Sequence, residues 1–306
     1  MKQNPFSLYD FLGYLIPGST VIYLFLIIEN WTSVNGKNSI EGIFSSVSKY
    51  DFQEIFFFII ISYSLGHLIS FISSITVEKY GNWKYGYPSK TIIGYTKESY
   101  WIKKSLPEGS KETKLLYEVE KNNNKDRKLS NVGRGLLLIL LIPLVLIEFL
   151  FGTLLNFKNF YSKGLDVALT DIIKENVLLL LNSKKLSNSK VFIESDLKDI
   201  DFNRIVHHYV FENSRKHQFR LVNYVALYGF LRNLVLAFVL SSWYYLIISL
   251  KTINTAYYIN WSMIGLNLLL MGLSFVSFMA YMKFYRRYTL EGLMLLVVDK
   301  TIEEQH

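Results

Sequence analysis

Four stretches of the chain carry apolar side chains on every helical face and are long enough to cross a membrane. They cover about residues 8–28, 55–77, 222–250 and 259–282. About 20 apolar residues, at a rise of ~1.5 Å each, cross the ~30 Å hydrocarbon core of a bilayer, whereas a helix of a soluble domain needs only one apolar stripe. The pattern therefore predicts an all-α, polytopic membrane protein with four full spans.

A fifth apolar run, residues 135–157, is also long enough to span, but it contains Pro143, Glu148 and Gly152. If it crosses, residues 158–220 lie on the opposite side from the segment before it, and the last hairpin is inverted against its basic flank. If it enters and returns on one side, with Pro143 near the turn, protein must cover its irregular backbone. We favour four full spans plus a re-entrant run, with five spans as the alternative.

Polar segments with helical patterning separate the apolar runs. Within the second of them, residues 166–181 alternate apolar and charged positions at helical spacing, which predicts an amphipathic helix. The chain divides into an N-terminal transmembrane hairpin 1–77, a basic segment 78–134, the apolar helix 135–157, a charged helical segment 158–220, a C-terminal transmembrane hairpin 221–287 and an amphipathic tail 288–306. We expect both charged segments and the tail to be cytoplasmic.

The distribution of basic residues predicts this orientation. Lys and Arg outnumber the acidic residues by 33 to 25, for a net charge of +8. Since cation-rich flanks stay in the cytoplasm, both chain ends and residues 78–134 and 283–306 are predicted inside, and residues 29–53 and 251–258 outside. Basic residues directly beside a span are typical of contact with anionic lipid head groups, so we expect the lipid bilayer as a partner and no nucleic acid.

Composition and motifs exclude several kinds of chemistry. Only 19% of the residues are charged and 51% are hydrophobic, and there is no cysteine, which excludes disulfides, thiol catalysis and cysteine-based metal sites. A phosphate-binding loop, HExxH and GxSxG are all absent from the sequence. We therefore expect no catalytic residue, no cofactor and no enzymatic activity. Abundant Lys, Asn, Ile, Phe and Tyr indicate a bacterium with an AT-rich genome, hence its inner (plasma) membrane.

His67 is the ionisable side chain nearest the middle of the second apolar stretch. At that depth an imidazole lines a polar path or stays neutral with a hydrogen-bond partner on a neighbouring helix. The adjacent Gly66 permits close helix approach, which favours the second interpretation.

Arg232, Asn233 and Glu148 are further polar residues within apolar runs. Arg232 either pairs inside the helix bundle, with Glu148 or Asp10 as its partner, or is an interfacial cation before a span that begins at Asn233. A charged Glu148 at mid-bilayer costs about 2.5 kcal/mol or more. It should therefore be neutral, paired, or near the surface in a hairpin.

Two prolines predict hinges. Pro17-Gly18 lies within the first span and predicts a kink or local unwinding, and Pro143 predicts a second break.

One cluster resembles a metal site only superficially. His207, His208, Glu212 and His217 lie close together, but their spacing places no third ligand, so a solvated helix face is favoured and no metal is expected.

Several short motifs resemble motifs of a known group of proteins. They are residues 9–18 (YDFLGYLIPG), 65–67 (LGH), 228–233 (YGFLRN) and 286–288 (RRY). Together they are similar to motifs of uncharacterised bacterial multi-pass inner-membrane proteins. This resemblance covers about a tenth of the chain and implies no established activity.

The first function hypothesis is a non-enzymatic membrane subunit whose cytoplasmic segments bind a protein partner, or a second copy of the chain, and couple it to the spans. Sensors and effectors of bacterial stress or phage defence have this layout, which is an analogy at the level of architecture. The alternative is an ion channel or small-solute transporter that uses the intramembrane His67 and Arg232. An intramembrane lipid-modifying enzyme ranks third.

Overall fold

The computed structural model describes residues 10–32, 51–95, 100–101, 130–159, 164–183, 191–198, 200–256 and 261–298. Within these ranges every regular element is a helix, so the all-α prediction is confirmed. In chain order the elements are η1 (Phe11–Leu15), α2 (Ile16–Thr32), α4 (Phe52–Ser73), η2 (Ser74–Glu78), α5 (Lys79–Tyr85), α6 (Pro88–Ile92), α8 (Ile142–Ile147), η3 (Glu148–Leu154), α10 (Val167–Leu181), η4 (Glu194–Lys198), α11 (Phe202–Asn213), α12 (Gln218–Ala256) and α13 (Trp261–Val298).

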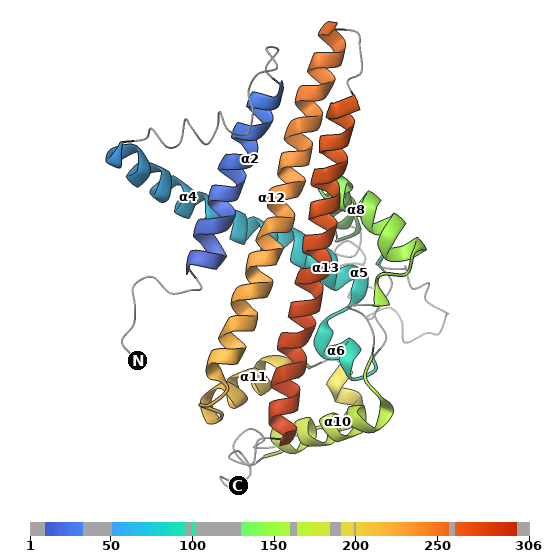
Figure 1. Cartoon of the computed structure of the whole chain (residues 1–306). Coiled ribbons are helices and arrows are strands. Elements are labelled where there is room, and N and C mark those ends of the chain that lie inside the picture. The colour runs from blue at the N-terminus through green and yellow to red at the C-terminus, as the bar shows by residue number, and fades with distance from the viewer. Residues whose placement is uncertain are drawn as a thin grey trace, which may run out of the picture.

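Within the described ranges, four helical stretches are long and apolar enough to cross a membrane, as the sequence predicts. They are Phe11–Glu29, Phe52–Ile92, Gln218–Lys251 and Ile264–Val298. The helices α12 and α13 lie side by side as a long hairpin, and α4 runs obliquely across it (Figure 1). Both hairpin helices continue beyond the predicted spans, so the same rigid rods reach from the apolar bundle into the polar end of the molecule.

The fifth apolar run is a bent pair of helices. Ser130–Leu140 and Ile142–Leu154 meet at 81°, and Pro143 stands in the first turn of the second helix, where its missing N–H is tolerated. Protein covers the bend, as an irregular backbone at membrane depth requires. Leu141 is fully buried, and the indole Nε1 of Trp243 donates to the carbonyl oxygen of Leu140 at 2.8 Å.

The two flanks of this bent pair lie at the same end of the molecule. Ile92 and Ile93, before it, and Ile173 and Val177, after it, are buried in one core together with Leu293 of α13. A full crossing would place these flanks on opposite faces of a membrane. The shared core therefore favours the re-entrant arrangement with four full spans.

Among the described residues, the bundle contains one large core and a small cluster around Ile28, Tyr245 and Leu270, and what we call the cap contains a second large core. The cap comprises α6, α10, η4 and α11 with the ends of α12 and α13 that pack on them, and it lies at one end of the long hairpin (Figure 1). The amphipathic helix predicted at 166–181 is confirmed as α10, whose apolar stripe faces this second core. The cytoplasmic orientation of the cap stays a prediction.

The helices α2 and α4 cross in backbone contact. A Cβ on Gly18 would lie 1.8 Å from the carbonyl oxygen of Ser62, and one on Gly66 would lie 1.9 Å from that of Tyr14. A π turn, η1, ends at Leu15, two residues before Pro17, and the helix continues through Pro17 as α2. Gly18 therefore serves close packing, and its role in a hinge stays a prediction.

Candidate functional site

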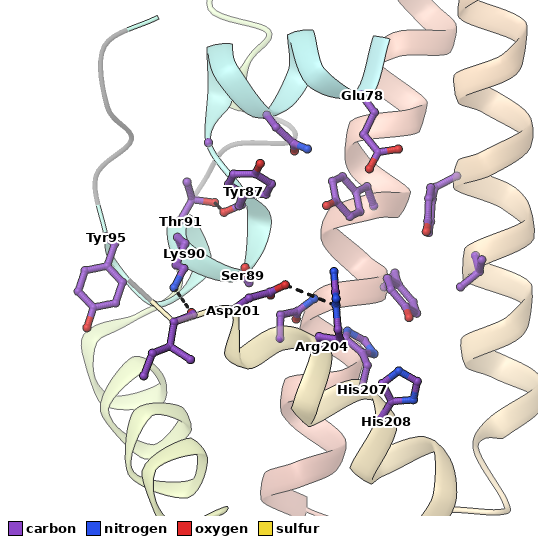
Figure 2. A pocket seen from close by; sticks show the side chains of 18 of the residues that line it. Glu78, Tyr87, Ser89, Lys90, Thr91, Tyr95, Asp201, Arg204, His207 and His208 are labelled. Atoms are coloured by element: carbon purple, nitrogen blue, oxygen red, sulfur yellow. Dashed lines mark hydrogen bonds and ion pairs between the residues drawn. The ribbon is translucent and has the colours of Figure 1, made fainter. Parts of the chain in front are cut away.

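A cavity of about 1060 Å³ lies where the spans meet the cap. The helices α5 and α6 form one wall, α11 lies opposite them, and α12 and α13 complete the enclosure (Figure 2). Its lining combines aromatic rings such as Tyr285 and Tyr288 with the cations Lys90, Lys198 and Arg204. Since large pockets with a few polar groups in apolar surroundings are the usual ligand sites, this cavity is the candidate functional site.

Lys90 ties one wall of the cavity to the loop before α11. Its ammonium group donates to the carbonyl oxygens of Leu197 and, at 2.6 Å, of Ile200. The same group lies 4.7 Å from the centroid of the Phe202 ring, a cation–π contact. Lys90 is therefore a fixed positive charge in the wall.

His207 stands inside the cap rather than on a solvated helix face. It is 8% exposed, and its ring stacks on that of Tyr288 at 4.1 Å. Gly292 makes room for it, because a Cβ there would lie 2.3 Å from Cε1 of the imidazole. Burial, aided by the charge of His208, lowers the pKa of His207 to about 4, so the ring is neutral near pH 7.

The neighbours of His207 do not assemble a metal site. His208 and Glu212 are exposed, and among the residues that the structure describes no group of three or more His, Asp or Glu side chains could hold a metal ion. In the structure His207 is buried, whereas His208 and Glu212 point to the exposed side of α11.

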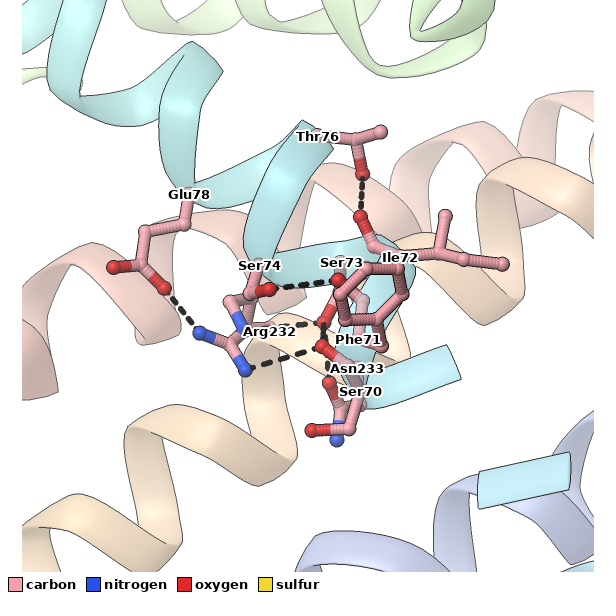
Figure 3. Close-up of polar contacts among 9 residues, drawn as sticks. All are labelled: Ser70, Phe71, Ile72, Ser73, Ser74, Thr76, Glu78, Arg232 and Asn233. Atoms are coloured by element: carbon pink, nitrogen blue, oxygen red, sulfur yellow. Dashed lines mark hydrogen bonds and ion pairs between the residues drawn. The ribbon is translucent and has the colours of Figure 1, made fainter. Parts of the chain in front are cut away.

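A polar network runs from the cavity towards the N-terminal span, and Figure 3 shows its central contacts around Arg232. Glu78 lines the cavity and forms an ion pair with Arg232, whose side chain is 12% exposed. Nε of Arg232 donates to Oγ of Ser73 at 3.1 Å, and that hydroxyl donates to Oδ1 of Asn233 at 2.5 Å. Arg232 is therefore paired inside the bundle, and its partner is Glu78 rather than Glu148 or Asp10.

Asn233 completes the network at the π turn of the first span. Its Nδ2 donates to the carbonyl oxygen of Gly13 at 2.8 Å. Pro17, four residues later, has no N–H that could pair with this carbonyl. The amide of a distant helix thus satisfies a backbone group that the proline leaves without its usual intrahelical donor.

Glu148 is paired in a second network, away from the cavity. It is fully buried in η3 and accepts from the ammonium of Lys84 and from the hydroxyls of Tyr85 and, at 3.2 Å, Tyr80. Gly152 leaves room for the carboxylate, because a Cβ there would lie 2.8 Å from Oε1 of Glu148. The sequence left Glu148 as neutral, paired or near the surface, and in the structure it is paired.

His67 joins neither network. Its ring is exposed on the surface of α4, stacks on Tyr14 at 3.8 Å and meets Tyr63 edge-on at 4.6 Å. The close approach that Gly66 permits therefore brings an aromatic ring, rather than a hydrogen-bonding helix, to the imidazole.

Sequence reasoning missed Glu78 and Lys84, the partners of the two charges that it singled out. Both lie just past the end of the second apolar stretch, and their partners lie in the first half of α12 and in the bent pair. Matching each intramembrane charge to an opposite charge at the same depth would have suggested them. No such signal marks Asn82 and Asn203, which reach the cavity from separate segments.

Comparison of the chain with protein-family models, with curated proteins and with solved structures finds no match. The site must therefore be interpreted from its own geometry.

Proposed function

We propose that the protein is a non-enzymatic membrane subunit that binds a ligand or partner at the cap and couples its presence to the spans. The observation that carries this proposal is the double role of Glu78. Its carboxylate lines the cavity and also pairs with Arg232, which leads through Ser73 and Asn233 to the π turn of the first span.

The long hairpin supports the same proposal. The helices α12 and α13 contribute side chains to the cavity and, farther along, to the bundle core, so a change at the cap acts directly on rods that enter the membrane. Coupling requires an element with two arrangements that the cavity can bias. The π turn η1 beside Pro17 is the best candidate for that element.

The pore hypothesis has less support from these contacts. His67 faces outward from a single chain, and the guanidinium of Arg232 is engaged by Glu78.

Distance measurements between spin labels test the coupling. The chain has no cysteine, so Phe11→Cys and Ile247→Cys, two exposed positions on η1 and α12, give one labelled pair. We expect Glu78→Gln to shift or broaden the distance distribution in liposomes, because it removes the charge that holds Arg232. The matched control is Glu291→Gln, which breaks the α12–α13 pair with Arg220 away from the network and should leave the distribution unchanged.

An unchanged distribution in Glu78→Gln, together with a lower unfolding temperature, would show that the network only stabilises the bundle. The same result for Arg232→Gln would complete that refutation.

A further inference from the structure

The cavity contains buried polar atoms that the protein itself leaves without partners. Among the described residues, Oδ1 of Asn82, Oδ1 of Asn203 and both ring nitrogens of His207 are buried and lack a hydrogen-bond partner. All three side chains line the cavity, and His207 is 8% exposed. Since buried polar groups in folded proteins are nearly always paired, these atoms point to a ligand.

The chemistry of these atoms specifies what the ligand must present. A carboxamide oxygen accepts hydrogen bonds and does not donate, so Asn82 and Asn203 call for donors on the ligand. A neutral imidazole offers one donor and one acceptor. A ligand part with several hydroxyl groups, or with N–H groups, matches this set.

The charges of the cavity favour an anion. The lining has four residues with permanent positive charge and two acids. One acid, Glu78, is neutralised by Arg232, which lies behind the lining, and the other, Asp201, is 3.6 Å from Arg204. Lys198 and Arg204 are exposed at the cavity and are free of the backbone contacts that fix Lys90. Because Arg204 shares its charge with Asp201, Lys198 contributes the larger part of the net positive charge of this pair.

The position of the cavity adds a third constraint. Its wall from Glu78 to Thr91 follows directly on the apolar part of α4, and Val222 and Val225 belong to the start of the α12 span. The predicted spans place this wall near the lipid head groups, where basic pockets between spans bind lipid phosphates. A volume of about 1060 Å³ also accommodates far more than an inorganic ion.

We propose that the cavity binds a phosphate ester whose organic part carries hydroxyl or N–H donors. The phosphate faces Lys198 and Arg204, and the donors face Asn82, Asn203 and His207. The ester belongs either to a lipid head group or to a soluble metabolite, and the two sources share this chemistry. The inference rests on the proposed function, since it names the ligand class of the same cavity.

Native mass spectrometry of the purified full-length protein tests the proposal. The protein is offered phosphatidylglycerol, whose head group has hydroxyl donors, together with phosphatidylcholine, whose head group has none, and in a separate arm soluble glycerol 3-phosphate. We expect either retention of phosphatidylglycerol over phosphatidylcholine by about tenfold, which assigns the lipid source, or binding of glycerol 3-phosphate, which assigns the soluble source. Equal retention of both lipids without binding of glycerol 3-phosphate, or no binding at all, overturns the proposal.

Matched charge variants separate the cavity from the general surface. Lys198→Gln with Arg204→Gln should reduce the retained ligand roughly ten- to thirtyfold, since each cation near the phosphate contributes a few-fold in affinity. Arg215→Gln with Lys216→Gln removes the same charge from exposed positions outside the lining and should change little. An equal loss in both pairs overturns the proposal, because it would reflect surface attraction alone.

Asn203→Leu tests the donors of the ligand. It should abolish the preference for phosphatidylglycerol, or the binding of glycerol 3-phosphate, while retaining the folded protein. A preference that survives this change and His207→Phe overturns the assignment of the donors.

The outcome is distinct from that of the spin-label experiment. Ligand binding with an unchanged η1–α12 distance in Glu78→Gln would refute the coupling and leave the ligand class standing. A distance that responds to Glu78→Gln with no phosphate ester bound would do the reverse.

Discussion

Buried ionisable side chains differ in their pairing between the spans and the cap. In the bundle, the buried charges are matched by opposite charges: Glu148 by Lys84, and Arg232 by Glu78. In the cap, His207 is also buried but has no hydrogen-bond partner among the described residues, and its pKa is lowered to about 4. Paired charges stabilise one arrangement of helices, whereas an unpaired ring beside a cavity leaves interactions available for a ligand.

The largest expected effect comes from breaking a pair in the bundle. Lys84→Met leaves the fully buried Glu148 with only tyrosine hydroxyls, and removing one partner of a buried pair costs about 3–5 kcal/mol. Because Lys84 is 24% exposed, we expect a loss near the lower end of this range. The free energy of unfolding in detergent, followed by tryptophan fluorescence, gives the measurement.

The control for this prediction is a surface pair. Lys174→Met breaks a contact with Glu194, which is 61% exposed, so the loss should stay within about 1 kcal/mol. Should Lys84→Met fail to fold, Tyr85→Phe removes one donor to Glu148 and should cost about 1–3 kcal/mol. Losses as small as the surface control in both variants would contradict the comparison.

The pH dependence of stability probes the cap. An unfolded histidine binds a proton near pH 6.5, while His207 in the folded protein binds one only near pH 4. The unfolded state therefore holds more protons between these values, and stability falls as the pH falls through this window. At about 1.4 kcal/mol per pH unit the loss attributable to His207 is about 3 kcal/mol.

His207→Phe, which keeps a ring beside Tyr288, should flatten this part of the stability curve. His208→Gln, at an exposed neighbouring position, should keep most of the slope. Identical slopes in the wild type and in His207→Phe between pH 6.5 and 4 would mean that the ring is not buried as described.

The smallest expected change in the free energy of unfolding comes from removing one hydrogen bond in the bundle. Asn233→Leu removes the donor to the carbonyl of Gly13 and should cost about 0.6–2 kcal/mol. In a Pro17→Ala background the restored N–H can serve this carbonyl, so Asn233→Leu should cost less there. A double-mutant cycle of unfolding free energies measures the difference, and strictly additive costs would show that the two residues do not share the carbonyl.

The spans were predictable because their signal is local. A run such as residues 55–77 is apolar on every face, so no information about distant residues is needed to place it in a bilayer. The bend at residues 140–142 was predictable from Pro143 for the same reason. The choice between a return to the same side and a full crossing was not, because it depends on whether Ile92 and Ile173 meet in one core.

The candidate site was largely unpredictable because it is assembled from four separate parts of the chain. His207 looked solvated within its own helix, and only contact with Tyr288 and Gly292, about eighty residues later, buries it. The partner of Arg232 is 154 residues away from it in the chain, so its spacing in the sequence carries no signal. Depth in the membrane, rather than spacing, is the property that such pairs share.

The hydrogen bond from Asn233 to Gly13 also constrains how the protein is made. The two residues are 220 positions apart, and ribosomes add about 5–20 residues per second, so roughly 10–40 s of synthesis separate the carbonyl from its donor. An unsatisfied carbonyl in hydrocarbon is unfavourable throughout that interval. The first span therefore reaches its final form only after the insertion machinery delivers α12, and biogenesis of the N-terminal hairpin ends when the C-terminal hairpin arrives.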